Sequence, residues 1–127
     1  MSSKIRILYV DDEEPNTVVF KAAFKGNNFE VTTTESASSA LALLEKDKFD
    51  IIVSDQRMPG MTGVDFFTTV RSKEIQGVRI LMTGFADNNV MMDAINKAHI
   101  FYYCTKPWKA KELKNIFLNA IEFADRK

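Results

Sequence analysis

The sequence predicts an α/β fold in which five parallel strands alternate with five helices. Short apolar runs rich in β-branched residues alternate along the chain with stretches in which apolar residues recur at helical spacing. In addition, four of the predicted strands end on a carboxylate, hydroxyl or ammonium side chain. Such alternation is typical of a parallel sheet that is covered by helices on both faces and connected by right-handed crossovers.

The first half of the chain contains three predicted strands and two helices. The strands are the apolar runs at residues 4–10, 29–33 and 49–54. Pro15 suits the first turn of a helix, where its missing N–H group has no bond to lose. Glu35-Ser36 can cap the second helix. The residues of these two helices that we expect to face the core are Val18, Val19, Ala22, Ala23, Ala40, Leu41, Leu43 and Leu44.

The second half contains two further strands and three helices. The strands lie at residues 78–82 and 100–105. The helices are expected to begin at Gly63, at a cap formed by Asp87 or Asn88, and at about Lys109. The last helix, which should end near Ala124, has the clearest helical period in the chain. The inward residues should be Val64, Phe67, Val70, Val90, Met91, Ala94, Ile95, Ala98, Leu113, Ile116, Phe117, Ala120 and Ile121.

Composition favours one globular domain over residues 1–127. Hydrophobic residues make up 46% of the chain and charged residues 27%, which is typical of a folded domain. The formal net charge is +0, which argues against a dedicated nucleic-acid binder. No apolar run approaches the ~20 residues of a membrane span, and no secretory signal is recognisable. A single cysteine, Cys104, has no internal disulfide partner, so we expect a cytoplasmic protein.

The polar residues at the strand ends point to phosphoryl chemistry. Asp11 and Asp12 follow the first strand, Asp55 the third, Thr83 the fourth and Lys106 the fifth. The ends of parallel strands share one edge of the sheet, where open α/β sheets keep their ligand sites. Nearby carboxylates repel unless a cation neutralises them, and an all-oxygen site suits Mg²⁺. One carboxylate could then accept a phosphoryl group as a nucleophile, with the ammonium and hydroxyl groups donating to its oxygens.

Each of these residues has a simpler alternative when it is taken alone. The acids after the first strand could serve only the start of a helix, and Asp55 could be an ordinary turn residue. Thr83 could bond locally, and Lys106 could be solvated. His99, the only histidine, is best interpreted as a cation at the end of the fourth helix. The joint placement of the other residues is what the simpler alternatives leave unexplained.

Four motifs carry a resemblance to a known family. They are Tyr-Val-Asp-Asp-Glu at 9–13, Ser-Asp-Gln-Arg-Met-Pro-Gly-Met-Thr-Gly at 54–63, Thr83-Gly84, and Tyr-Cys-Thr-Lys-Pro-Trp at 103–108. Together they resemble the receiver domain of bacterial two-component response regulators, including the chemotaxis receiver, over residues 4–124. The resemblance implies a flavodoxin-like (βα)5 three-layer sandwich with strand order 2-1-3-4-5.

The resemblance also implies roles for individual residues. Asp55 would be the phosphoacceptor, and Thr83 and Lys106 would hold the phosphoryl oxygens. The implied Mg²⁺ ligands are Asp12, Asp55, the backbone carbonyl of Arg57 and, mainly through water, Asp11. Tyr103 would be the switch aromatic that follows Thr83 on phosphorylation, unless it stays packed against the fourth helix. The Lys106–Pro107 peptide bond is expected to be cis.

The implied partner is a sensor histidine kinase or a phosphotransfer protein, with small phosphodonors as a substitute. The fourth helix, fifth strand and fifth helix would form the readout face, which could contact an output domain or a second copy. No direct contact with nucleic acid or membrane is implied. The motifs at Thr83 and Lys106 look like those of receivers fused to HD-type phosphodiesterases or to hydrogenase-regulating output domains.

Three other protein classes fit the sequence less well. A haloacid-dehalogenase-type phosphohydrolase needs a second Asp two residues after its nucleophile, where this chain has Arg57. A flavodoxin-like cofactor module needs a phosphate loop after the first strand, where this chain has four acids at residues 11–14. A degenerate receiver would lack an acid, hydroxyl or lysine position, and all are present here. Two side chains stay open: Arg57 could cover the phosphoryl group or face solvent, and Trp108 could anchor the last helix or meet a partner.

Overall fold

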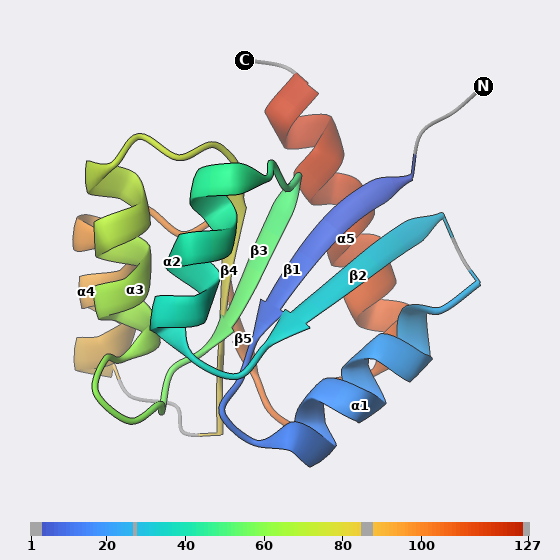
Figure 1. The fold of residues 1–127 in the computed structure, drawn as a ribbon, viewed down its shortest axis with the longest axis horizontal. Coiled ribbons are helices and arrows are strands. Elements are labelled where there is room, and N and C mark those ends of the chain that lie inside the picture. The colour runs from blue at the N-terminus through green and yellow to red at the C-terminus, as the bar shows by residue number, and fades with distance from the viewer. Residues whose placement is uncertain (1–3, 27, 85–87, 126–127) are drawn as a thin grey trace.

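The computed structural model describes residues 4–26, 28–84 and 88–125, in which five strands alternate with five helices (Figure 1). The strands are β1 (Ile5–Val10), β2 (Phe29–Thr34), β3 (Ile51–Asp55), β4 (Val78–Thr83) and β5 (Tyr102–Thr105). The helices are α1 (Glu14–Phe24), α2 (Ala37–Lys46), α3 (Gly63–Ser72), α4 (Asn88–Lys97) and α5 (Ala110–Asp125). The predicted alternation of elements is therefore confirmed.

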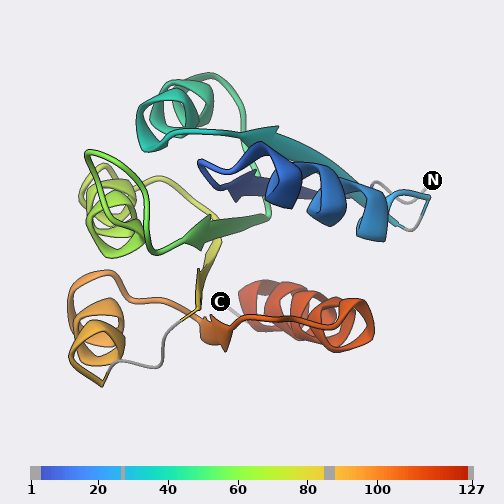
Figure 2. The same ribbon diagram turned by 90° about the horizontal axis from the view of Figure 1, so that it is seen from below.

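The strands form one parallel sheet in the order β2-β1-β3-β4-β5, as the family resemblance implies. Helices α2, α3 and α4 cover one face of the sheet, and α1 and α5 cover the other (Figure 2). Each face has its own apolar core cluster. Because the central strand β3 is covered on both faces, all its residues are buried, which explains its continuous apolar run.

Helix α1 turns a different face to the core from the one expected. Val18 and Val19 are each 59% exposed and Ala22 is also exposed, so the prediction that these three residues face inward is wrong, whereas Ala23 is partly buried against the core. The buried residues of α1 are Thr17, Phe20 and Phe24, which recur at helical spacing. The two phenylalanines bury more apolar area than the two valines would, and Phe20 stacks on Tyr9 of β1 with ring centroids 4.0 Å apart.

Helix α2 agrees well with its sequence pattern. Ser36 caps the helix, because its side-chain oxygen accepts a hydrogen bond from the backbone N–H of Ser39 at 3.1 Å. Ala40 and Leu44 are buried, while Leu41 and Leu43 are partly buried against the same cluster.

A few details of the later elements differ from the prediction. Ile95 of α4 is 49% exposed, so the prediction that it faces inward is wrong. The buried residues at this end of the helix are Ala94 and Ala98. Two strands begin two residues later than expected, β3 at Ile51 and β5 at Tyr102. The predicted cap at Asp87 lies outside the described residues, and Asn88 is the first residue of α4.

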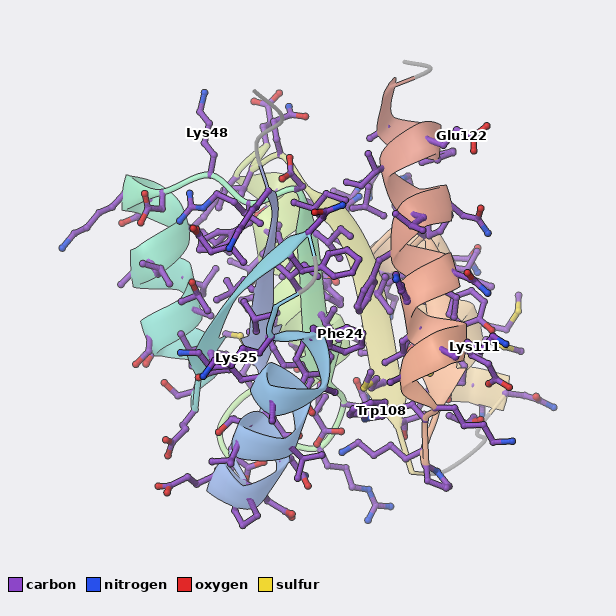
Figure 3. The ribbon with its side chains drawn as sticks, turned by 90° about the vertical axis from the view of Figure 1, so that its right-hand side faces the viewer. Phe24, Lys25, Lys48, Trp108, Lys111 and Glu122 are labelled. Carbon is purple, nitrogen blue, oxygen red and sulfur yellow. The ribbon has the colours of Figure 1, made fainter. Side chains whose placement is uncertain are left out.

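Trp108 joins the start of α5 to α1. Its ring stacks on Phe24 with centroids 5.9 Å apart and meets the edge of Phe20 at 5.7 Å. Figure 3 shows Phe24 and Trp108 in the space between α1 and α5. Trp108 is therefore an anchor between these helices, and this contact fixes the chain immediately after Lys106.

Candidate phosphoryl-transfer site

The predicted site residues meet at one edge of the sheet. Asp55 is the last residue of β3 and Thr83 the last of β4, while Asp11 directly follows β1 and Lys106 directly follows β5. The loops after these strands gather at the lower edge of the view in Figure 1. The ends of β4 and β5 are tied together, because the backbone N–H of Lys106 donates to the Thr83 carbonyl oxygen at 2.8 Å.

Three carboxylates lie close enough to share a cation. Asp11, Asp12 and Asp55 each offer an oxygen atom, and these three atoms lie within 4.8 Å of one another. Asp11 and Asp55 are buried, while Asp12 is partly exposed at the mouth of the site. Three negative charges at this separation repel strongly in a low-dielectric environment.

Lys106 brings one positive charge to these carboxylates. Its Nζ atom lies 2.9 Å from Asp55 Oδ1 and 3.6 Å from Asp11 Oδ2. The ammonium group thus bridges two of the three acids and points toward the atom proposed to accept a phosphoryl group. One ammonium group offsets only one of three negative charges, so the site retains a negative potential that favours a hard divalent cation.

The electrostatic environment shifts the pKa of both members of the closest pair. Burial raises the pKa of the Asp55 carboxyl group, with a further increase from Asp11 and Asp12, although the hydrogen bond and charge of Lys106 act in the opposite direction. Burial acts to lower the pKa of Lys106, but its contacts with Asp55 and Asp11 outweigh burial and raise it. Lys106 therefore stays protonated and can act as a fixed positive charge.

Asp11 is held by donors that the sequence analysis did not identify. Its Oδ2 atom accepts hydrogen bonds from the Tyr9 hydroxyl at 2.7 Å and from Asn16 Nδ2 at 3.1 Å. Its Oδ1 atom accepts the backbone N–H of Glu13 at 3.0 Å. Burial raises the pKa of the Tyr9 phenol, as does its bond to Asp11, so the hydroxyl stays a donor. A tyrosine in the apolar end of β1, two residues before Asp11, was the available sequence signal for this contact.

The loop after Asp55 is fixed by backbone bonds and by a close approach of α3. The N–H of Gln56 donates to the Met82 carbonyl, and the Gln56 side-chain oxygen accepts the N–H of Val64 at 2.9 Å. A Cβ atom on Gly63 would lie 2.6 Å from the Asp55 carbonyl oxygen and 2.6 Å from a methyl group of Leu81. Gly63 is therefore needed for packing here, a role that its position at the helix start did not reveal.

A cleft of about 710 Å³ opens over these residues. Its walls include Asp12, Arg57, Thr83, Gly84 and Lys106. Arg57 is exposed, and the structure places its side chain at the cleft without assigning it a role. The cleft is large enough for a phosphoryl group together with a hydrated cation.

Of the two predicted switch residues, Thr83 lines this cleft, whereas Tyr103 lines a different pocket. Thr83 is buried with 3% of its surface exposed. Tyr103 is partly buried and packs against the core cluster on the α4 side of the sheet. The Lys106–Pro107 peptide bond is cis, as expected. His99 lies beyond the end of α4 and lines a different pocket, which includes Arg79 and Phe123, so it is not part of this site.

The oxygen atoms at this site are of the kind that Mg²⁺ prefers. The ligands available are carboxylate and backbone carbonyl oxygens, which suit a hard cation. Asp11, Asp12 and Asp55 bring their oxygens to one place, and the resemblance implies that Asp12, Asp55 and the Arg57 carbonyl would hold the ion directly. The retained negative charge of the three acids gives a physical reason for such binding.

Comparisons with known proteins agree with this geometry. Residues 7–118 match the family described as the response regulator receiver domain. The chain is 36% identical over 116 residues to the hydrogenase transcriptional regulatory protein HoxA of Cupriavidus necator, covering 91% of this chain and 24% of that protein. It is 33% identical over 113 residues to the chemotaxis protein CheY of Pseudomonas aeruginosa, covering 87% of this chain and 90% of CheY.

Solved structures support the same assignment. The signal receiver domain of an HD domain-containing protein from Pseudomonas fluorescens superposes with a TM-score of 0.92 at 27% identity, covering 98% of this chain and 99% of that one. The chain spans about a quarter of the length of longer curated relatives such as HoxA and AtoC of Escherichia coli. Within the described ranges, the helices lack the length and apolar character that a membrane crossing needs. The chain therefore belongs to the receiver domain family of response regulators, which act in two-component phosphorelay signalling.

Proposed function

We propose that Asp55 accepts a phosphoryl group in a Mg²⁺-dependent reaction. The observation that carries this proposal is the convergence of three carboxylate oxygens within 4.8 Å, with Lys106 Nζ 2.9 Å from Asp55 Oδ1, beside an open cleft. A carboxylate in this position can attack phosphorus once a cation and an ammonium group offset the repulsion between its charge and the phosphoryl oxygens.

The donor is a phosphohistidine on a sensor histidine kinase or a phosphotransfer protein, or a small molecule such as acetyl phosphate. An Asp55 oxygen forms a bond to phosphorus as the bond from phosphorus to the donor nitrogen breaks, and the imidazole leaves with that electron pair. Lys106 and Thr83 donate to the phosphoryl oxygens. Asp12, Asp55 and the Arg57 carbonyl would hold Mg²⁺, with Asp11 acting mainly through water, and the ion when bound would further neutralise the charge.

The domain catalyses only its own phosphorylation and dephosphorylation. Water later attacks the aspartyl phosphate and releases inorganic phosphate, so the free Asp55 carboxylate is restored. Such a domain acts as a timed switch in the cytoplasm, and residues 1–127 form one receiver unit.

Thr83 and Tyr103 carry the signal to the readout face. Thr83 moves toward the phosphoryl group, and the partly buried ring of Tyr103 takes the space beside α4. Phosphorylation shifts this equilibrium because Thr83 contacts the phosphoryl group in only one of the two states. The readout face consists of α4, β5 and α5, whose exposed large apolar residues are Met92, Ile95, Tyr102, Leu118 and Phe123.

Two exposed surfaces, one on α1 and one on the readout face, suit different partner proteins. The exposed Val19 of α1 lies next to the site, since Val19 and Lys106 line the same pocket. This surface suits an apolar helix of the kinase or phosphotransfer protein. The readout face suits an output domain, fused or separate, or a second copy of this domain. HoxA is named a transcriptional regulatory protein, and the Pseudomonas fluorescens relative is named an HD domain-containing protein, which supports a fused output.

Intact mass after exposure to acetyl phosphate and Mg²⁺ tests the proposal. We expect one added phosphoryl group on the wild type, no addition after EDTA treatment, and no addition to Asp55→Asn. Labelling of Asp55→Asn to the wild-type level would overturn the assignment. Release of phosphate from simple phosphate esters without a stable adduct would instead indicate a phosphohydrolase.

A further inference from the structure

Asp11 is surrounded by hydrogen-bond donors. Three donors contact its Oδ2 atom or lie near it: the Tyr9 hydroxyl at 2.7 Å, Asn16 Nδ2 at 3.1 Å and Lys106 Nζ at 3.6 Å. Its Oδ1 atom accepts the backbone N–H of Glu13 at 3.0 Å. A carboxylate oxygen has about two lone pairs, so these contacts occupy most of the coordination capacity of Asp11.

The hydrogen bond from the Tyr9 hydroxyl is the shortest of these contacts, and the Tyr9 ring is tightly packed. The Tyr9 side chain is 1% exposed, and its ring lies nearly parallel to that of Phe20, at an interplanar angle of 4° with centroids 4.0 Å apart. The stacked ring cannot swing away without opening the core between β1 and α1. A buried hydroxyl also needs an acceptor, and Asp11 Oδ2 provides it.

This arrangement bears on which cation the site accepts. Mg²⁺ demands near-octahedral geometry and keeps several of its waters, so it tolerates an acid that acts through a water molecule. Ca²⁺ is larger, takes six to eight oxygen ligands and gives up water readily, so it gains from every carboxylate that can coordinate it directly. Holding Asp11 away from direct coordination therefore favours Mg²⁺ over Ca²⁺.

We propose that Tyr9, with support from Asn16, is a positioning residue that keeps Asp11 out of direct coordination and so makes the site selective for Mg²⁺ over Ca²⁺. The inference rests on the proposed function, because it concerns the cation of that same site. Outer partners of metal ligands commonly influence affinity by ~10–100-fold, which is ample for a change in selectivity.

The test compares Mg²⁺ and Ca²⁺ binding to the unphosphorylated protein. Thermal unfolding is measured over a range of each cation concentration, and the dissociation constants follow from the stabilisation. The variant Tyr9→Phe removes the hydroxyl and keeps the stacked ring. We expect the ratio of the Ca²⁺ to the Mg²⁺ dissociation constant to fall by at least about threefold, since Asp11 becomes available to the larger ion.

One further variant tests the inference independently, and another serves as a control. Asn16→Ala removes the second side-chain donor from a partly exposed position on α1, and it should lower the same ratio by a smaller factor even if Tyr9→Phe fails to fold. Ser72→Ala deletes an exposed hydroxyl at the last residue of α3, away from the site, and should leave the ratio unchanged. A wild-type ratio in both Tyr9→Phe and Asn16→Ala would overturn the inference, whatever happens to the separate affinities.

The two proposals fail in different ways. If the wild type gains no stability from Mg²⁺ and takes up no phosphoryl group, the proposed function is wrong and the selectivity inference falls with it. If the wild type binds Mg²⁺ and is phosphorylated, but the ratio does not respond to loss of the Tyr9 hydroxyl, only the inference is wrong.

Discussion

At the scale of single residues, the site buries a carboxylate whose negative charge disfavours folding, next to the ammonium group of Lys106. Burial raises the pKa of Asp55 even though Lys106 lies 2.9 Å away. A raised pKa means that the folded protein binds this proton more tightly than the unfolded chain does. The ionised form of Asp55 therefore opposes folding as pH rises above the ordinary aspartate range, around 4. The proposed phosphoryl transfer needs an ionised carboxylate, which gives a reason for this unfavourable charge.

Replacing Asp55 by Asn should stabilise the protein in the absence of divalent cations. We expect the melting temperature at pH 7 to rise by about 2–5 °C, because a neutral side chain removes the cost of the buried charge. The difference should disappear as pH falls below about 4, where Asp55 is protonated in both states. Calorimetry with EDTA present measures this, and Glu35→Gln, an exposed position, is the control. A lower melting temperature for Asp55→Asn would contradict the pKa direction.

Saturating Mg²⁺ should make the wild type more stable than Asp55→Asn. The wild type should gain stability with rising Mg²⁺ concentration, while Asp55→Asn should gain less, because it has lost one carboxylate ligand. The measurement is the change in melting temperature between EDTA and saturating Mg²⁺ in parallel scans. Equal shifts in the two proteins would show that Asp55 does not help to bind the cation.

At the scale of elements, the site depends on how tightly α3 approaches the end of β3. Gly63 begins α3 where a Cβ atom would lie 2.6 Å from the Asp55 carbonyl oxygen. Two effects oppose each other in Gly63→Ala. Helix propensity favours alanine by about 1 kcal/mol, whereas overpacking against fixed backbone costs about 1–3 kcal/mol or more. The clash should win, because the backbone oxygen of β3 is held within the sheet.

We expect Gly63→Ala to lower the free energy of unfolding by about 1–2 kcal/mol and to slow phosphorylation of Asp55. Gly84→Ala is the matched control for stability, because a Cβ atom there would have no heavy atom within 4 Å. Urea unfolding and the rate of labelling by acetyl phosphate are the two measurements. If Gly63→Ala were as stable as the control, the close approach of α3 would be unimportant.

At the scale of the whole molecule, the aromatic core and the proposed readout face occupy different regions. The α1–α5 side is an aromatic core in which Phe20, Phe24, Phe117 and Trp108 contact one another. The readout face of α4, β5 and α5 includes an edge strand of the sheet and exposed apolar side chains such as Ile95 and Leu118. The aromatic core joins α5 to α1, and the edge around β5 offers a surface for contact.

If the readout face joins two copies, charge placed on it should prevent phosphorylation-dependent association. We expect sedimentation velocity to show a monomer before treatment and a dimer after beryllofluoride, an analogue of the phosphoryl group, is added with Mg²⁺. Ile95→Glu should weaken the dimer by at least about tenfold, since it buries an unpaired charge. Val18→Glu, which adds the same charge on α1, should leave association unchanged. Persistence of the monomer in the treated wild type would show that this face serves another partner.

The sequence by itself determined the order of the elements and the positions of the strand ends. These features depend on local patterns: apolar runs, helical periods, and the carboxylate, hydroxyl or lysine that follows each strand. Given a parallel sheet, Asp11, Asp55, Thr83 and Lys106 had to share one edge, and the structure places them there. Their roles in phosphoryl transfer stay predictions that the labelling experiment addresses.

The tertiary structure alone decided which faces are buried and which atoms meet. Helix α1 offered two apolar faces, and only its packing against β1, α5 and Trp108 selected Phe20 and Phe24 over Val18 and Val19. Helix α3 can approach β3 closely because Gly63 has no side chain. This role follows only from the positions of Asp55 and Leu81 in the folded structure. The bond from Tyr9 to Asp11 likewise depends on a ring orientation set by Phe20. Such contacts join segments that are distant in the sequence, so no local pattern encodes them.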